Sequence, residues 1–311
     1  MNTKQLAAAL ALALALGLCG LAQAKEGGDQ YPNGAENWMA GAVPPPGGYF
    51  INYAGYYSGK LRDGNGDKVP GASVDAWFDA LRYVHVTPHQ ILGGNWGWHV
   101  IAPLVHQRIR MGGGSDTEAS LGDVTVSPFI LSWHRGNWHW AAALDVYVPL
   151  GEYHSGEPRR SIGANYWSFE PLFAVTYLNE QGWEASAKFM YNFKSTNTSF
   201  SPFQGGPKMD YRSGDEFHMD FLLGKHFGPW GVGVSGYYVQ QTTDDTLDGE
   251  TVSSALGPWS DGRKGRVLAF GPSVNYAAKN GMQFIAQWQH ETLVKNRFGG
   301  DKFWLKLIMP L

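Results

Sequence analysis

The pair His154-Ser155 is the nearest approach in this sequence to a catalytic signature. Nucleophilic catalysis needs a serine within hydrogen-bond reach of a histidine, and a third group that orients that histidine. Adjacent residues of an extended chain point to opposite faces, and this pair lies in an expected loop after Leu150. A loop contact is therefore the favoured interpretation, with a lipid-modifying hydrolase as the alternative. We predict that the chain is not an enzyme.

Asp63, Asn65 and Asp67 alternate like the first three ligands of a calcium-binding loop. However, Lys68 stands where such a loop turns on glycine, and no glutamate follows at the closing position. A solvated turn is the favoured interpretation, so we predict neither a metal nor a cofactor. Cys19 is the only cysteine, so disulfides cannot organise the chain.

A larger set of polar side chains recurs at every second position of otherwise apolar segments. If they line an open pore, their excess of acidic groups favours cations or neutral solutes over anions. The alternative is that they pair with one another and fill the interior. The candidates for lining a lumen are Asp75, Asp79, His139, Asp145, Tyr147, Glu170, Glu184, Lys188, Glu216, His218, Asp220, Gln283, Gln287 and Lys306.

The elements that must position these residues are strands with a period of two. Between Trp138 and Leu150 every even position is apolar, whereas the odd positions include His139 and Asp145. The segment 183–194 repeats this alternation with Lys188 on its polar side. Because a lysine facing lipid near the midplane costs about 2–4 kcal/mol, Lys188 should point inward.

Twelve segments carry this alternation, and an even number returns the chain to its starting side. After the N-terminal run, no stretch approaches the roughly 18 apolar residues of a membrane helix. Hydrocarbon cannot satisfy backbone N–H and C=O groups, so membrane strands must close on themselves. We predict an all-β fold, a transmembrane antiparallel up-and-down β-barrel of about twelve strands. The predicted strands are 49–57, 74–86, 95–105, 124–133, 138–150, 166–178, 183–194, 216–225, 230–241, 266–276, 282–294 and 303–311.

The predicted connections alternate between short turns and longer polar loops, as in outer-membrane barrels with short periplasmic turns and long extracellular loops. Aromatic residues such as Trp133, Trp138 and Trp183 flank the short turns and suit the membrane interface. The short turns are 87–89, 135–137, 179–182, 228–229 and 279–281, and the long loops are 58–73, 107–123, 151–165, 195–215 and 242–265.

One predicted strand, 74–86, conflicts with a simple alternation. Turning Asp75 and Asp79 inward would turn Arg82 outward to lipid. A β-bulge within 79–81 would exchange the two faces, because one extra residue reverses the parity. We therefore predict a bulge there.

Residues 1–24 resemble a secretory signal peptide, with Lys4, an apolar run and an Ala22-Gln23-Ala24 cleavage site. A retained signal-anchor helix is the alternative. Cleavage would leave 23 basic against 27 acidic residues, a formal net charge of −4 (24 − 1 − 27). This balance argues against a nucleic-acid partner. We expect export to the bacterial outer membrane, where the barrel-assembly machinery would insert the protein. Outer-membrane lipids would then surround it.

Residues 25–48 form a Gly/Pro-rich segment ahead of the predicted barrel, 49–311. Three consecutive prolines have no backbone N–H groups to donate to a neighbouring strand, so this segment cannot be a membrane strand. It could fold back as a lumen plug, or it could be a loose periplasmic tail. The plug candidates are Glu36, Trp38, Met39, Pro44, Pro45 and Pro46.

The run from Tyr31 to Phe50 resembles the start of the phenol-degradation meta-pathway family of outer-membrane proteins, which includes SphA-type proteins. Its specific part is Gly34-Ala35-Glu36, followed by Ala40-Gly41 and Pro44-Pro45-Pro46-Gly47. The resemblance implies a barrel for passive uptake of small hydrophobic or aromatic solutes. The alternatives are the hydrolase and a structural or adhesive barrel without transport.

Overall fold

The structure is a computed structural model that describes residues 29–311. The expected leader, 1–24, lies outside the described residues. Within 29–311, no helix is long and apolar enough to cross a membrane.

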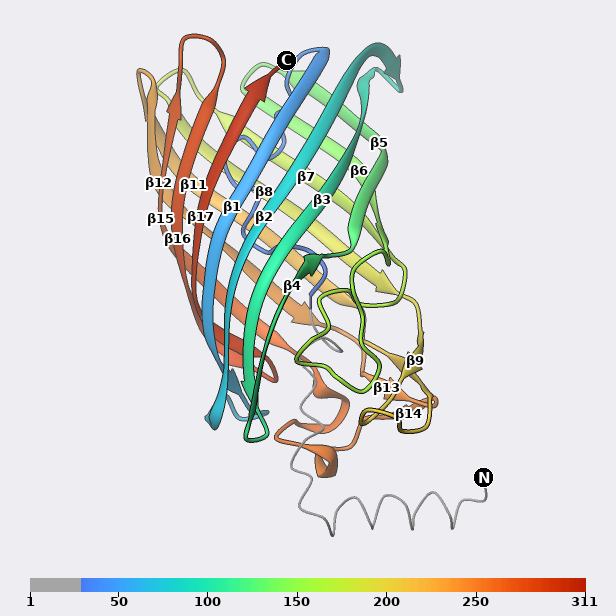
Figure 1. The fold of residues 1–311 in the computed structure, drawn as a ribbon. Coiled ribbons are helices and arrows are strands. Elements are labelled where there is room, and N and C mark those ends of the chain that lie inside the picture. The colour runs from blue at the N-terminus through green and yellow to red at the C-terminus, as the bar shows by residue number, and fades with distance from the viewer. Residues whose placement is uncertain (1–28) are drawn as a thin grey trace.

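One antiparallel sheet closes on itself to form the barrel (Figure 1). The first strand, β1, pairs with β2 on one edge and with the last strand, β17, on the other. Closure leaves no free sheet edge around the membrane region, which a lipid environment requires. The barrel strands are β1 (Gly47–Arg62), β2 (Lys68–Ile91), β3 (Gly94–Met111), β5 (Val124–Arg135), β6 (Trp138–Val148), β7 (Ser168–Leu178), β8 (Trp183–Lys194), β11 (Glu216–Phe227), β12 (Trp230–Gln241), β15 (Arg266–Ala277), β16 (Gln283–Lys295) and β17 (Phe298–Pro310).

The predicted twelve-stranded antiparallel barrel is confirmed, and each predicted segment is a strand of it. Two predicted loops are wrong, however. Most of 58–73 belongs to β1 and β2, and most of 107–123 belongs to β3 and to an added strand, β4 (Gly114–Leu121), that pairs with β3. The alternation in these extensions is reversed, since Leu61, Ala72 and Ile109 face inward while polar residues face out. Such a pattern is expected where the barrel extends beyond the membrane and its outer face meets water.

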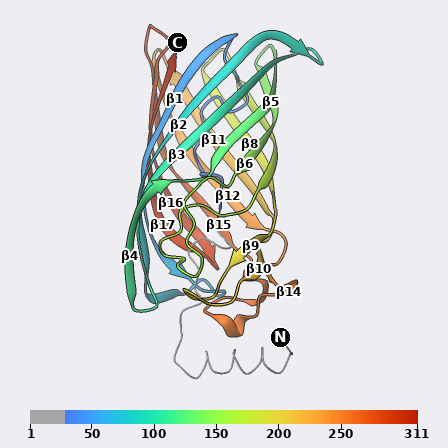
Figure 2. The ribbon, with the colours of Figure 1, turned by 45° about the vertical axis from the view of Figure 1, so that its right-hand side comes forward.

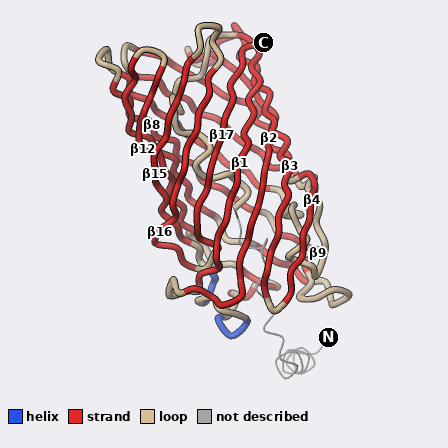
Figure 3. The backbone as a smooth tube through the Cα atoms, turned by 60° about the vertical axis from the view of Figure 1, so that its left-hand side comes forward, coloured by secondary structure: helices blue, strands red, loops and turns tan. Residues whose placement is uncertain are grey.

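Tight turns join the strands at one end of the barrel, and the long connections gather at the other (Figures 1 and 2). We assign the tight-turn end to the periplasm and the loop end to the exterior. Short helical turns lie at the loop end (Figure 3). The loop-end elements are β9 (Asn197–Phe200), β10 (Met209–Arg212), β13 (Thr246–Leu247), β14 (Glu250–Thr251), η1 (Ser254–Leu256) and η2 (Asp261–Arg263), and the four strands form a small separate sheet.

Large apolar side chains cover the outside of the barrel. Leu223 is 61% exposed and Val234 is 50% exposed, whereas their neighbours Leu222 and Ser235 are buried inside. Trp138 and Trp183 lie exposed beside the tight turns, where an interfacial belt is expected. A continuous apolar exterior with a polar interior is the arrangement that lipid stabilises.

Placing arginine on this exterior is expected to destabilise the barrel. Val234→Arg should lower the free energy of unfolding from phospholipid vesicles by about 2 kcal/mol or more, because the charge enters hydrocarbon. Urea titration followed by tryptophan fluorescence measures the change. Lys225→Arg is the matched control, since Lys225 already carries a charge beside the Trp183 and Phe227 rings near the tight turns. Equal stability of the two variants would contradict the assigned lipid face.

The predicted bulge in β2 is wrong. Residues 79–81 keep continuous register with both neighbouring strands. Asp75 and Asp79 lie on the outward parity, so their predicted place in the lumen is also wrong. Outward Asp79 bonds the Asn52 amide, and outward Asp75 pairs with Arg110 at 3.0 Å. These local partners stabilise the outward carboxylates. Arg82 has the opposite parity in β2 and therefore points inward.

Candidate lumenal site

Residues 29–46, here called the lumen segment, run through the inside of the barrel (Figure 1). At the loop end Asp29 pairs with Arg297, which connects β16 to β17. Farther along, Gly41 N donates to Thr176 Oγ1 on β7 at 3.0 Å. The segment then reaches the tight-turn end, where β1 begins at Gly47. It therefore spans the lumen between the two mouths.

Asp220 on β11 is the main anchor of the lumen segment. Its carboxylate is fully buried and accepts hydrogen bonds from the Tyr31 hydroxyl (2.6 Å), Gly34 N (2.9 Å) and Glu36 N (3.1 Å). The Gly34 carbonyl accepts from Gln287 Nε2 at 2.5 Å. Gly34 has φ +83°, and a side chain there would collide with β12 and β16 side chains, so glycine is required at this turn.

Glu36 forms the second anchor of the lumen segment, on the side of the lumen opposite Asp220. Arg82 Nη1 lies 3.0 Å from the Glu36 carboxylate and 2.9 Å from the Tyr53 hydroxyl, which itself hydrogen-bonds Glu36. The Lys306 ammonium donates to the neighbouring Ala35 carbonyl. A buried charge that is paired and hydrogen-bonded in this way avoids the cost of lone desolvation.

Trp38 is the third anchor and packs where two strands carry glycine. Side chains at Gly224 and Gly231 would collide with its ring, while its Nε1 donates to Ser273 Oγ at 2.7 Å. The next residue, Met39, donates its backbone N–H to Glu184 at 2.6 Å. The glycines thus provide the space into which the indole fits.

The two ends of the lumen segment are held differently. At the loop end, burial raises the pKa of Asp29, but the Arg297 guanidinium outweighs it and brings the pKa well below its ordinary value. At the tight-turn end, Pro44, Pro45 and Pro46 lie partly exposed, and Pro45 accepts a hydrogen bond from the Tyr49 hydroxyl at 2.8 Å. The charged end is ionised at neutral pH, whereas the proline end has few polar contacts.

Most other residues predicted to line the lumen are inward and buried: Asp145, Tyr147, Glu170, Glu184, Lys188, Glu216, His218, Asp220, Gln287 and Lys306. His139 and Gln283 take the same parity near the tight-turn end and are half-buried. Some pair with one another, since the Tyr147 hydroxyl donates to Glu170 at 3.1 Å and His218 lies 3.5 Å from Glu216. Others pair with further buried side chains, as Glu216 does with Lys194 at 2.5 Å. That these side chains face a solute pathway stays a prediction.

A cavity of about 370 Å³ remains between the lumen segment and strands β1–β3. Its two sides differ in chemistry. One side, here called the apolar wall, is made of inward side chains of β2 and β3: Val74, Ala76, Phe78, Ala80, Ile101, Pro103, Val105 and Ile109. The other side carries the polar residues of the lumen segment and of β6 and β8. The lumen is therefore amphiphilic.

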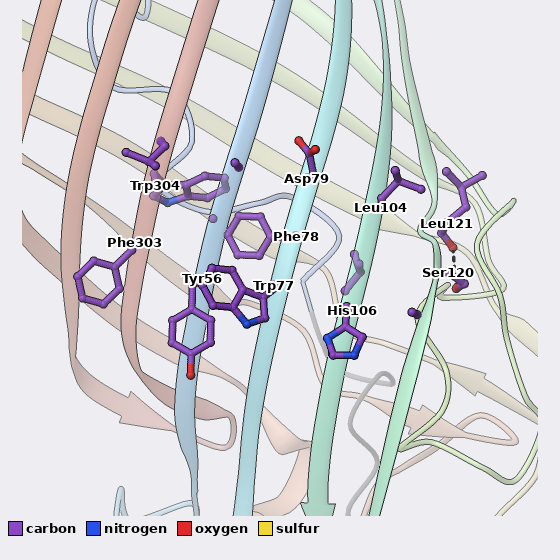
Figure 4. Close-up of a pocket in the computed structure, with 15 residues that line it drawn as sticks. Tyr56, Trp77, Phe78, Asp79, Leu104, His106, Ser120, Leu121, Phe303 and Trp304 are labelled. Atoms are coloured by element: carbon purple, nitrogen blue, oxygen red, sulfur yellow. Dashed lines mark hydrogen bonds between the residues drawn. The ribbon is translucent and has the colours of Figure 1, made fainter.

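A second hollow, of about 840 Å³, lies across β17, β1, β2, β3 and β4 (Figure 4). Outward Trp77 packs on Tyr56 with ring centroids 4.6 Å apart, and Phe78 packs edge-on against Trp304 at 4.7 Å. The strand ladders at this place are continuous, so backbone separates this outer groove from the lumen.

Several residues of the site escaped the sequence prediction. Arg82 was not among the predicted lumen-lining residues, although the predicted bulge at 79–81 would have turned it inward, and His99 and Lys302 lie in strands whose alternation is weak. The apolar residues Trp77, Leu81 and Tyr83, which share the outward parity of β2, are the signal that could have placed Arg82 inward without a bulge. Asp29 and Arg297 pair across 268 residues, and no local pattern encodes such a contact.

The alternative chemistries have no support in the described loops. Ser155 Oγ donates to the Ser199 carbonyl at 2.5 Å, whereas His154 pairs with Glu152 at 3.0 Å. The Asp63 carboxylate accepts the backbone N–H groups of residues 65, 66 and 67, as in a solvated turn.

The barrel is similar to that of a solved outer-membrane channel. The COG4313 outer membrane channel from Pseudomonas putida F1 matches with a TM-score of 0.73 at 14% identity, covering 91% of this chain and 100% of that one. The Bordetella autotransporter BrkA β domain (TM-score 0.48, 11% identity, 86% and 100% covered) and the Pseudomonas putida toluene transporter TodX (0.43, 11%, 93% and 95%) are also similar. The first likeness shows the fold of an outer-membrane barrel.

No curated protein matches the chain. A family model matches residues 58–307, which is most of the barrel. The chain therefore belongs to the family described as "Putative MetA-pathway of phenol degradation".

Proposed function

We propose that the protein is an outer-membrane channel for passive uptake of small hydrophobic or aromatic compounds. The observation that carries the proposal is the apolar wall, which lies inside a barrel whose other strands supply most of the inward polar groups. A channel for hydrophilic solutes has a polar, water-filled lumen, and a strip of inward-facing aliphatic and aromatic side chains would not help such solutes. An apolar solute loses its contacts with lipid when it enters the lumen, and contacts with the apolar wall replace them.

The lumen segment is proposed as the plug of this channel. Its anchors are side chains and backbone groups of the lumen, and none of its residues 29–46 is a barrel strand. Displacing it therefore breaks no sheet ladder. The exposed prolines at the tight-turn end have few contacts to lose, so we place the moving part there.

Several finer expectations accompany this proposal. The leader would be cleaved after Ala24, and the barrel-assembly machinery would insert the chain among outer-membrane lipids. The chain has no nucleotide motif that could couple transport to an energy source, so movement would follow the solute gradient. We propose no catalytic role for His154 and Ser155, whose side chains bind different partners.

Uptake of labelled toluene tests the proposed function. Cells that lack the gene are compared with the same cells carrying it on a plasmid, at toluene concentrations low enough for the outer membrane to limit uptake. Faster uptake in the complemented cells, with unchanged uptake of arabinose, is expected. Equal toluene uptake in the two strains would reject the proposal.

Gly41→Val is expected to displace the lumen segment while every barrel residue is left unchanged. A side chain at Gly41 would come within 2.6 Å of the His139 carbonyl and 2.7 Å of Thr176 N, which are backbone atoms that cannot move aside. Single-channel conductance in planar bilayers should rise severalfold. Ala42→Val, at a half-buried position, is the matched control. If both variants conduct like the parent, Gly41 does not seat a plug.

A further inference from the structure

On its tight-turn side, the lumenal cavity is lined by polar groups that have no hydrogen-bond partner among residues 29–311. Lys188 on β8 is 8% exposed, and its ammonium lies over the Tyr31 ring, 4.6 Å from the centroid, with no hydrogen bond. Asp145 Oδ1 on β6 and His99 Nε2 on β3 are buried and likewise unpaired. All three residues line the one cavity. Because unsatisfied buried groups are costly, a cluster of them indicates a place for a ligand.

The protonation of His99 follows from its neighbour. Arg82 Nη2 lies 2.7 Å from His99 Nδ1, and a guanidinium can only donate, so Nδ1 accepts. The ring proton of neutral His99 therefore lies on Nε2, which faces Asp145 Oδ1 at 3.4 Å. That separation exceeds a normal hydrogen bond. The cavity thus presents two donors, Lys188 and His99, and one acceptor, Asp145.

The apolar wall begins directly beside these polar groups. In the β2–β3 ladder, Arg82 is opposite Ile101, Ala80 is opposite Pro103, and Phe78 is opposite Val105. A molecule with its polar atom near His99 can therefore lay its body on Ile101 and Ala80, in the direction of the loop end. The cavity volume of about 370 Å³ is sufficient for a single aromatic ring with a small substituent.

We infer that this cluster is a subsite for an aromatic hydroxyl group, so that the channel selects hydroxylated over unsubstituted aromatic compounds. The inference rests on the proposed function and names the solute class. A hydroxyl both donates and accepts, so it can donate to Asp145 Oδ1 while it accepts from Lys188 or His99. A carboxylate offers no proton for Asp145 and would be repelled by Asp145 and by Glu36, which lines the same cavity. A methyl group in place of the hydroxyl leaves all three atoms unpaired.

Uptake of phenol and toluene, which are nearly equal in size, provides the test. Cells lacking the gene receive the parent, Lys188→Met, Asp145→Asn or the control Lys225→Met, whose ammonium lies over the Trp183 ring. Each variant is first shown to migrate differently on gels with and without boiling, which reports a folded barrel. Competition between the two solutes at limiting concentration gives the ratio of phenol to toluene uptake.

The parent and Lys225→Met should favour phenol. Lys188→Met should lower the ratio of phenol to toluene uptake by about tenfold, since a hydrogen bond to a charged group is lost. Asp145→Asn replaces the carboxylate by a neutral amide, whose oxygen is a weaker acceptor, so it should lower the ratio as well. Ratios equal to the parent's in both variants, with toluene uptake intact, would overturn the subsite and leave the proposed function standing. A parental channel that speeds neither solute would overturn the proposed function itself.

Discussion

Deleting residues 31–46 is expected to raise the single-channel conductance on the order of tenfold, because the interior of a twelve-stranded barrel is then cleared along its length. The deletion keeps Gly47, where β1 begins, so every sheet ladder is retained. Asp220, Glu184 and Gln287 lose the partners that the lumen segment supplies, but water entering the opened lumen can replace those hydrogen bonds.

Planar bilayers with purified protein measure this effect. The matched control deletes residues 203–207, which lie in an exposed loop beyond the barrel. Both proteins should still migrate differently with and without boiling. A deletion protein that conducts like the parent would show that the lumen segment does not limit passage.

Arg82→Met is expected to lower the free energy of unfolding by about 3 kcal/mol, since it leaves the Glu36 carboxylate without its charge partner. The Arg82 and Glu36 side chains are only 15% and 25% exposed, so solvent screens the pair weakly. The change also removes the donor to His99 Nδ1. Urea titration in phospholipid vesicles measures the loss.

The double variant Arg82→Met with Glu36→Gln separates the ion pair from simple packing. The neutral amide introduced by Glu36→Gln no longer needs a cation, so the double variant should regain a large part of the lost stability. Lys60→Met, at an exposed position of β1, is the control for loss of one positive charge. If Glu36→Gln restores nothing, the pair does not hold the lumen segment in the way described above.

Where the outward side was apolar, the sequence was sufficient to predict the strands. β8 and β12 begin and end at the predicted residues, since lipid requires one apolar parity over their whole length. The same rule failed above the membrane. There Leu61 and Met111 pack inward against Trp259 and the outside is polar, so the strands continued through what looked like loops.

The candidate site was less predictable than the barrel. The prolines at 44–46 indicate that the lumen segment is no strand, but its path depends on contacts such as Tyr31 with Asp220, which are 189 residues apart. Asp79 was misplaced because a carboxylate on a membrane strand was assumed to face inward. A single outward amide, Asn52, is enough to reverse that preference.

The location of a bound aromatic molecule tests the central claim most directly. Crystals of the protein soaked in bromobenzene should show bromine by anomalous scattering in the lumenal cavity, against Phe78 and Ile101 of the apolar wall. Bromine found only in the outer groove beside Trp77 and Leu104, or nowhere in the protein, would contradict uptake through the lumen.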